Sequence, residues 1–140
     1  MDIETVFESV RDALADISTY TEVKTVAKHP DIWIKQQARF PILSLVFSQG
    51  NFDHETGDKL WSQTVKTRIE LEAHLIIINS YDSLSDEFLR QFVAIQDAII
   101  ALTKTAAFGA YGRIYLSNVQ VAHAETGEWV WAVMTLVVGE

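Results

Sequence analysis

Residues 68–80 read RIELEAHLIIINS, and this stretch decides what kind of fold the chain adopts. In an extended chain successive side chains point to opposite faces, so Ile69, Leu71 and Ala73 share one face and the residues between them share the other. This alternation is typical of a strand with one buried and one wetter face. In the LIIINS part both faces become apolar, which predicts that another element covers the end of the strand.

The polar face of this strand carries Arg68, Glu70, Glu72 and His74. Two carboxylates and an imidazole, each about 7 Å from the next along a strand, could bind a metal or transfer protons. Catalytic carboxylates, however, need burial or a fixed partner that separates their pKa values, and the nearby Lys66 and Arg68 would neutralise this row. We therefore expect these four residues to form a solvated or subunit-facing strand surface. A small enzyme that uses the two glutamates and His74 is the alternative.

The other elements follow from the spacing of apolar residues. Steps of three and four predict amphipathic helices, whereas alternation predicts strands. The predicted elements are helices at 2–17 and 85–104, strands at 39–48, 68–80, 113–123 and 128–138, and a long loop or flared hairpin at 49–64. Gly127 predicts the turn of a closing hairpin, and the pattern at 18–38 leaves helix and strand open. The expected fold is a single α+β domain, 1–140, with an antiparallel or mixed sheet, two packed helices and a long β-hairpin loop.

Composition limits the classes of function. The chain has 140 residues, 49% of them apolar, which suits one domain with a substantial core. Its 11 basic and 19 acidic residues give a net charge of -8, which disfavours tight binding to phosphate backbones or anionic membranes. The acidic start does not resemble a secretory signal, and the apolar run at 129–139 is too short to span a bilayer as a helix. We expect a soluble protein with no membrane partner.

Motifs for metals, cofactors and catalysis are weak. Asn51, Asp53 and Glu55 alternate as in a calcium loop, but Thr56 stands where the loop needs glycine and Ser62 where it needs glutamate. There is no cysteine, and the four histidines lack the H-E-x-x-H spacing. The glycines of FGAYG lack the rest of a phosphate-binding motif. The chain is therefore expected not to be an enzyme, with no catalytic, metal-binding or cofactor-binding residues.

Apolar side chains exceed what one core needs, and this excess is the stronger functional signal. The helix at 85–104 has a wide apolar face, and the last strand is apolar on both faces. Surfaces of this kind mark an oligomer or partner interface when nothing in the chain covers them. The residues predicted to bind partners are Phe52, Trp61, Phe108, Tyr111, Trp129 and Trp131. For the last two, burial in the core is an equal alternative.

In element order the chain resembles the tail terminators of tailed bacteriophages. The resemblance covers nearly the whole chain: the amino-terminal amphipathic helix, RFPILSLVF with Phe40 and Pro41, the polar hairpin region, RIELEAHLIIINS, the acid-capped helix and the closing hairpin that ends in EWVWAVMTLVVGE. Residues 18–38 match least well. The motifs that carry the resemblance are of low specificity.

The resemblance implies a subunit of a ring, generally a hexamer, that caps the tail tube, ends tube polymerisation and joins the tail to the head connector. Its partners would be further copies of itself, the tail tube protein and the connector protein, and DNA would pass through without specific binding. The resemblance also implies a lumen or interface face formed by Arg68, Glu70, Glu72 and His74. The protein would lie in the tail or neck of the virion, after assembly in the bacterial cytoplasm. The alternatives are another head-tail connector or minor tail protein, a small enzyme, and a monomeric binding module.

Overall fold

The computed structural model describes residues 3–17, 22–55, 64–78, 84–105 and 113–139. Within these ranges the chain forms three helices and one four-stranded sheet. The elements are α1 (Ile3–Ala15), α2 (Pro30–Lys35), β1 (Ile42–Glu55), β2 (Thr64–Ile78), α3 (Leu84–Thr103), β3 (Arg113–His123) and β4 (Trp129–Gly139). The predicted α+β fold is confirmed, and so are the two long helices and the closing hairpin, in which Gly127 has a φ of 73°.

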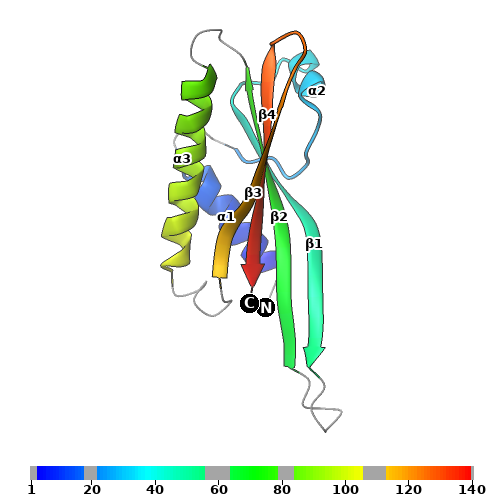
Figure 1. Ribbon diagram of the computed structural model, residues 1–140, viewed down its shortest axis with the longest axis vertical. Helices are drawn as coiled ribbons and strands as arrows, with labels where there is room; N and C mark the ends of the chain where they lie inside the picture. The colour runs from blue at the N-terminus through cyan, green and yellow to red at the C-terminus, as the bar shows by residue number, and fades with distance from the viewer. Residues whose placement is uncertain (1–2, 18–21, 56–63, 79–83, 106–112, 140) are drawn as a thin grey trace.

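The sheet is antiparallel throughout, with the strand order β1-β2-β4-β3 (Figure 1). β2 and β4 lie in the centre, and β1 and β3 form the two edges. The β1–β2 pair extends beyond the rest of the sheet, because β4 pairs with β2 only as far as Arg68. Pairs from Asn51–Arg68 to Glu55–Thr64 therefore form a projecting two-stranded ribbon.

Strand β1 is longer than the sequence predicted, and a β-bulge explains why. The pairing register shifts between Phe47 and Gln49, so Ser48 is an extra residue in β1. A bulge shifts the alternation of the side chains by one residue, which hides a continuing strand from a period-two pattern. The described parts of the segment 49–64 are paired as the two arms of a hairpin, one of the two structures expected there, and residues 56–63 lie outside the described residues.

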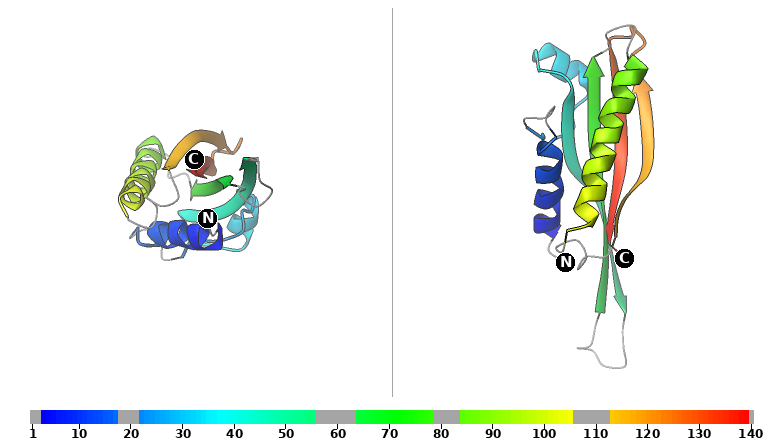
Figure 2. Two further views of the ribbon diagram at one scale, coloured as in Figure 1. Left: turned by 90° about the horizontal axis from the view of Figure 1, so that it is seen from below. Right: turned by 90° about the vertical axis from the view of Figure 1, so that its left-hand side faces the viewer.

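Helices α1 and α3 cover one face of the sheet and enclose the main core (Figure 2). The inward residues of β2 are Ile69, Leu71 and Ala73, all of which are fully buried, as the alternation predicted. The main core also receives Val6, Val10 and Leu14 from α1, Ile95 and Ile99 from α3, and Ala132, Met134, Leu136 and Val138 from β4. This face of the sheet therefore has the continuous apolar layer that an α+β domain needs.

Helix α2 covers one end of the opposite face. His29 caps its first turn, with its Nδ1 accepting a hydrogen bond from the Asp31 amide at 3.3 Å, and Pro30 occupies the first helical position, where a missing N–H does no harm. Trp33 of α2 packs with Ile42 and Ile76 in a second apolar cluster. The expectation that the LIIINS end of the strand is covered on both faces is confirmed.

The main core predicts a test of stability that uses one type of substitution at two sites. Leu71→Ala should lower the free energy of unfolding by about 2–5 kcal/mol, because it leaves a cavity at a fully buried position. Leu89→Ala, on the exposed side of α3, should change it by less than about 0.5 kcal/mol. Urea unfolding of both variants measures the two values, and equal losses would contradict the assignment of the core.

Candidate functional site

The predicted polar row lies on the sheet face opposite α1 and α3. Arg68, Glu70, Glu72 and His74 alternate with the buried residues of β2, as expected from the sequence. Arg68 Nη2 lies 3.9 Å from Glu70 Oε1, a loose pair between partly exposed groups that contributes little to stability. His74 differs from the rest of the row, since it is only 6% exposed.

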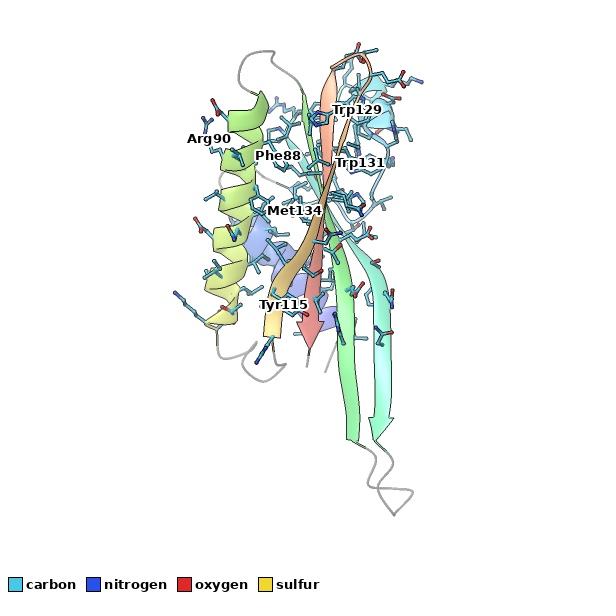
Figure 3. The ribbon with its side chains drawn as sticks, viewed as in Figure 1. Phe88, Arg90, Tyr115, Trp129, Trp131 and Met134 are labelled. Carbon is cyan, nitrogen blue, oxygen red and sulfur yellow. The ribbon has the colours of Figure 1, made fainter. Side chains whose placement is uncertain are left out.

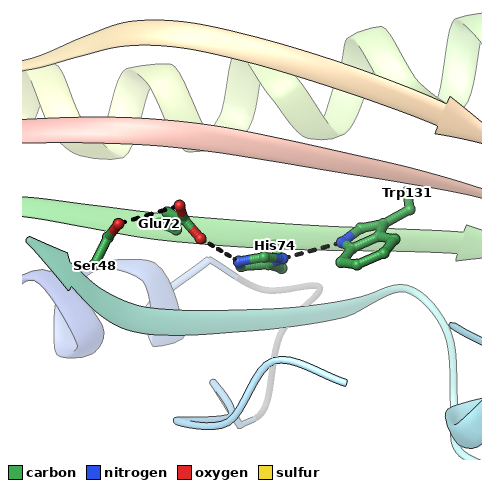
Figure 4. A network of polar contacts seen from close by, with 4 residues as sticks. All are labelled: Ser48, Glu72, His74 and Trp131. Atoms are coloured by element: carbon green, nitrogen blue, oxygen red, sulfur yellow. Dashed lines mark hydrogen bonds and ion pairs between the residues drawn. The ribbon is translucent and has the colours of Figure 1, made fainter. Parts of the chain in front are cut away.

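The buried His74 lies in a chain of polar contacts that crosses three strands (Figure 4). The Trp131 indole nitrogen on β4 donates a hydrogen bond to His74 Nδ1 at 3.1 Å. His74 Nε2 lies 3.0 Å from Glu72 Oε2, and the Ser48 hydroxyl on β1 donates to Glu72 Oε1 at 3.2 Å. An indole N–H can only donate, so His74 Nδ1 must carry a lone pair and Nε2 must carry the proton given to Glu72.

This order of contacts does not activate a nucleophile. In a serine triad the imidazole touches the serine and the carboxylate orients the imidazole. Here Ser48 bonds to the carboxylate, and both nitrogens of His74 are occupied by Glu72 and Trp131. Within the described ranges there is also no group of three histidine, aspartate or glutamate residues that could hold a metal ion. Both nitrogens of the His74 ring are therefore engaged in this arrangement, and the row offers hydrogen bonding and charge.

Trp129 and Trp131, two of the residues predicted to bind partners, are engaged within the chain. Both lie at the α2 end of β4 (Figure 3). Trp129 is buried and donates from its indole nitrogen to Asp31 Oδ1 at 3.0 Å, and Trp131 packs against the Trp33 cluster. His29 presents its ring edgewise to both indoles, at centroid distances of 5.2 and 5.5 Å. One subunit accounts for this packing, and a partner-binding role for the two tryptophans stays a prediction.

The other four predicted partner-binding residues cannot be placed in the same way. Trp61, Phe108 and Tyr111 lie outside the described residues. Phe52 contributes backbone pairing with Thr67 in the projecting ribbon, and its side chain lies outside the described part. Their roles stay predictions.

The structure adds a surface that the wide apolar face of α3 had indicated. Leu89, Val93 and Ile100 are 56%, 48% and 47% exposed, and their separations of four and seven residues place them on one side of the helix. Ala94, Ala98 and Ala101 lie on the other side, in a hollow shared with α1. The three exposed residues, which we call the α3 flank, therefore lie on the side of the helix away from α1.

The α3 flank is close to β3, an edge strand of the described sheet. Helix α3 lies between α1 and β3 (Figure 2, left) and contacts both. On β3, Val121 pairs with Ala132 of the main core, so its side chain points to the helix side, yet it is 44% exposed. No described strand pairs with the outer edge of β3. Apolar side chains thus occur at an edge where the described part of the chain provides no further strand.

The opposite edge of the sheet carries a second apolar surface. Phe47 of β1 is 44% exposed and lines an apolar hollow with Ile3 and Phe7 of α1. Part of the outer edge of β1 is covered by the chain itself, because the Lys24 amide donates to Leu43 O at 2.9 Å and Lys24 O accepts from the Leu45 amide at 2.7 Å. We call the hollow and the remaining β1 edge the β1 surface.

Neither a scan against protein-family models nor a search of curated proteins finds a match to this chain. No helix among the described residues is long and apolar enough to cross a bilayer. Function therefore has to be inferred from the surfaces that the chain itself presents.

The polar row yields a prediction that distinguishes a catalytic or metal-binding role of the two glutamates from a structural role. Replacing Glu70 and Glu72 with glutamine should leave the fold intact and change the free energy of unfolding by at most about 1 kcal/mol, since both side chains are partly exposed and glutamine still accepts hydrogen bonds. Thermal unfolding followed by circular dichroism measures this. Stoichiometric zinc or manganese in the purified protein, lost in the double variant, would contradict a structural role and favour an enzyme.

Proposed function

We propose that this chain is a structural subunit of a bacteriophage tail, which assembles into a ring, caps the tail tube and joins it to the head connector. The observation that carries the proposal is the presence of two different apolar surfaces at opposite edges of one sheet, the α3 flank beside β3 and the β1 surface. Surfaces of this kind are suited to binding another protein chain.

Two unlike surfaces favour a ring over a two-fold dimer. A two-fold interface uses the same patch on both subunits, whereas a head-to-tail interface joins two different patches and closes into a ring when the rotation allows it. The α3 flank lies on a helix beside the edge strand β3, with whose outer edge no described strand pairs, and the β1 surface offers an exposed aromatic side chain beside the other edge strand. The edges of one subunit can therefore complement those of the next.

The strand directions are compatible with this arrangement. Each strand is antiparallel to its neighbour in the order β1-β2-β4-β3, so β1 and β3 run in opposite directions. If copies are related by rotation about an axis along the strands, β3 of one subunit meets β1 of the next in antiparallel orientation, which permits ladder hydrogen bonds. All helices α1 and α3 then lie on one side of the ring wall, and all the polar rows lie on the other.

In such a ring the polar row would line the lumen. The carboxylates of Glu70 and Glu72 would repel the phosphates of passing DNA. The cationic side chain of Arg68 would attract them only weakly, because it is already near Glu70. The overall charge of -8 acts in the same direction. The lumen would thus let DNA through without holding it, which is what a joint between tail and head requires.

Another head-tail connector or a minor tail protein would use the same surfaces, so the deciding experiment measures both ring formation and tube growth. The mass of the purified protein in solution is measured by sedimentation at several concentrations, with and without tail tube protein. The lengths of the tubes are measured by electron microscopy. We expect a closed oligomer, six subunits on the family pattern, that stops tubes from growing. A ring that leaves tube length unchanged would favour a connector, and a chain that stays monomeric with the tube protein would contradict the proposal.

The α3 flank should be required for assembly. Val93→Glu places a charge in the proposed interface and should shift the protein to monomers, while the isolated subunit keeps its unfolding temperature, because Val93 is half exposed and outside the core. Ala101→Glu is the matched control, since it adds the same charge to the opposite side of the same helix. Sedimentation compares the two, and equal effects on assembly would argue against the flank as the interface.

The projecting hairpin should contact a neighbouring subunit or the tail tube. Replacing Phe52 and Trp61 with serine should impair assembly and leave the thermal stability of the isolated subunit unchanged, because the described part of the ribbon has no third strand beside it. A large fall in the unfolding temperature of the subunit would instead place these aromatic side chains in its core.

A further inference from the structure

We propose that His74 and Trp131 form a proton-sensitive latch that holds the α2 segment over the end of the sheet. The latch is the hydrogen bond from the Trp131 indole to His74 Nδ1, and protonation of His74 opens it. This inference does not depend on the proposed ring, because it concerns contacts within one subunit.

The donor and acceptor roles fix the protonation state in which the latch is closed. Trp131 supplies an N–H that cannot accept, so the bond at 3.1 Å exists only while His74 Nδ1 has a lone pair. The single ring proton then lies on Nε2, which donates to Glu72 at 3.0 Å. A second proton on the ring must go to Nδ1. The Nδ1–H group would then point at the indole N–H, and two donors cannot form a hydrogen bond.

The surroundings of His74 favour a stable open state as well as a closed one. Glu72, held by Ser48, remains next to Nε2 and compensates the positive charge. On β1, Ser44 pairs with His74 across the strands, and its buried hydroxyl has no hydrogen-bond partner in the described part of the chain. Cross-strand side chains of this kind begin about 5 Å apart. The Ser44 hydroxyl is therefore a further polar group on the strand beside the His74 ring.

Other charged groups on this face have partners of their own. Next to Ser44, Lys24 lies 3.1 Å from Glu22. On the α2 side, His29 is 3.5 Å from Asp31, and the Lys28 ammonium lies over the Trp33 ring at 5.1 Å. Further along β2, Arg68 is near Glu70. His29 is thus the second histidine in this cluster, and an experiment must separate it from His74.

Opening the latch would loosen α2, because Trp131 joins the sheet to the α2 segment. Its ring lies 5.5 Å from the His29 ring and packs on the cluster of Trp33, Ile42 and Ile76, all of which are buried. Histidine is the side chain that ordinarily titrates between about pH 5 and 8. In mild acid this apolar end of the sheet would become accessible, whereas near pH 8 it stays covered.

The test is nitrogen-15 NMR of the full chain from pH 8 to pH 5, with the Trp131 indole signal assigned from Trp131→Phe. At pH 8 we expect His74 to carry its proton on Nε2. At pH 5 we expect a doubly protonated ring, loss of the hydrogen-bonded shift of the Trp131 indole proton, and an increase of about fivefold or more in its exchange rate. The Trp129 indole is an internal control, because its acceptor is Asp31 and not His74.

Three variants assign the response to one histidine. His74→Gln can accept from Trp131 and donate to Glu72 without titrating, so it should remove the pH response and keep the fold. His123→Gln, on the exposed end of β3, and His29→Asn, which keeps a capping side chain, should leave the response in place. A His74 ring that stays neutral at pH 5, a protonated ring with an unchanged Trp131 signal, or an equal response in His74→Gln would each overturn the proposal.

Discussion

The position of every other element depends on the pairing of β2 with a strand on each side. β2 pairs with β1 from Ile76 to Thr64 and with β4 from Ile78 to Arg68, so its backbone groups have partners along most of its length. Its side chains are then forced to alternate between two faces. One face is apolar throughout its described part and accepts α1 and α3, while the other is polar in its middle and apolar only at the end that α2 covers.

Local patterns predicted the elements whose stability comes from burying one regular face. The helix at 2–17 has Val6, Val10 and Leu14 at helical spacing, and these are its fully buried residues. The six-residue α2 has no such stripe, since its packing is limited to Pro30 and Trp33 and depends on contacts with β1, β2 and β4. Tertiary contact decides the conformation of so short a helix. The strand pattern of β1 breaks at the bulge at Ser48. A bulge is defined by the pairing with a partner strand, so the alternation within β1 could not predict it.

In the candidate site, too, the sequence predicted the features that depend on a local period and missed those that depend on contacts between distant residues. That Arg68, Glu70, Glu72 and His74 share a face follows from the period of a strand, and the sequence predicted it. That His74 is buried follows from Trp131, a residue 57 positions away, and the anchoring of Trp129 follows from Asp31, 98 positions away. Contacts of this kind depend on the order of strands in the sheet, and a period within one segment carries no information about that order.

The two edges of the sheet differ in how much of them the chain protects, and this difference bears on the geometry of a ring. Natural sheets protect their edges with prolines, lysines, bulges or covering segments. Strand β3 has a register shift at Ser117, but it has neither proline nor lysine, and no described strand pairs with its outer edge. Strand β1 is also bulged, at Ser48, but it differs from β3 in being covered near Ser44 by Lys24, and no described segment covers its part beyond the bulge. A neighbouring β3 could pair only with that far part of β1, so adjacent subunits in the proposed ring would be displaced along the strand direction, toward the projecting hairpin.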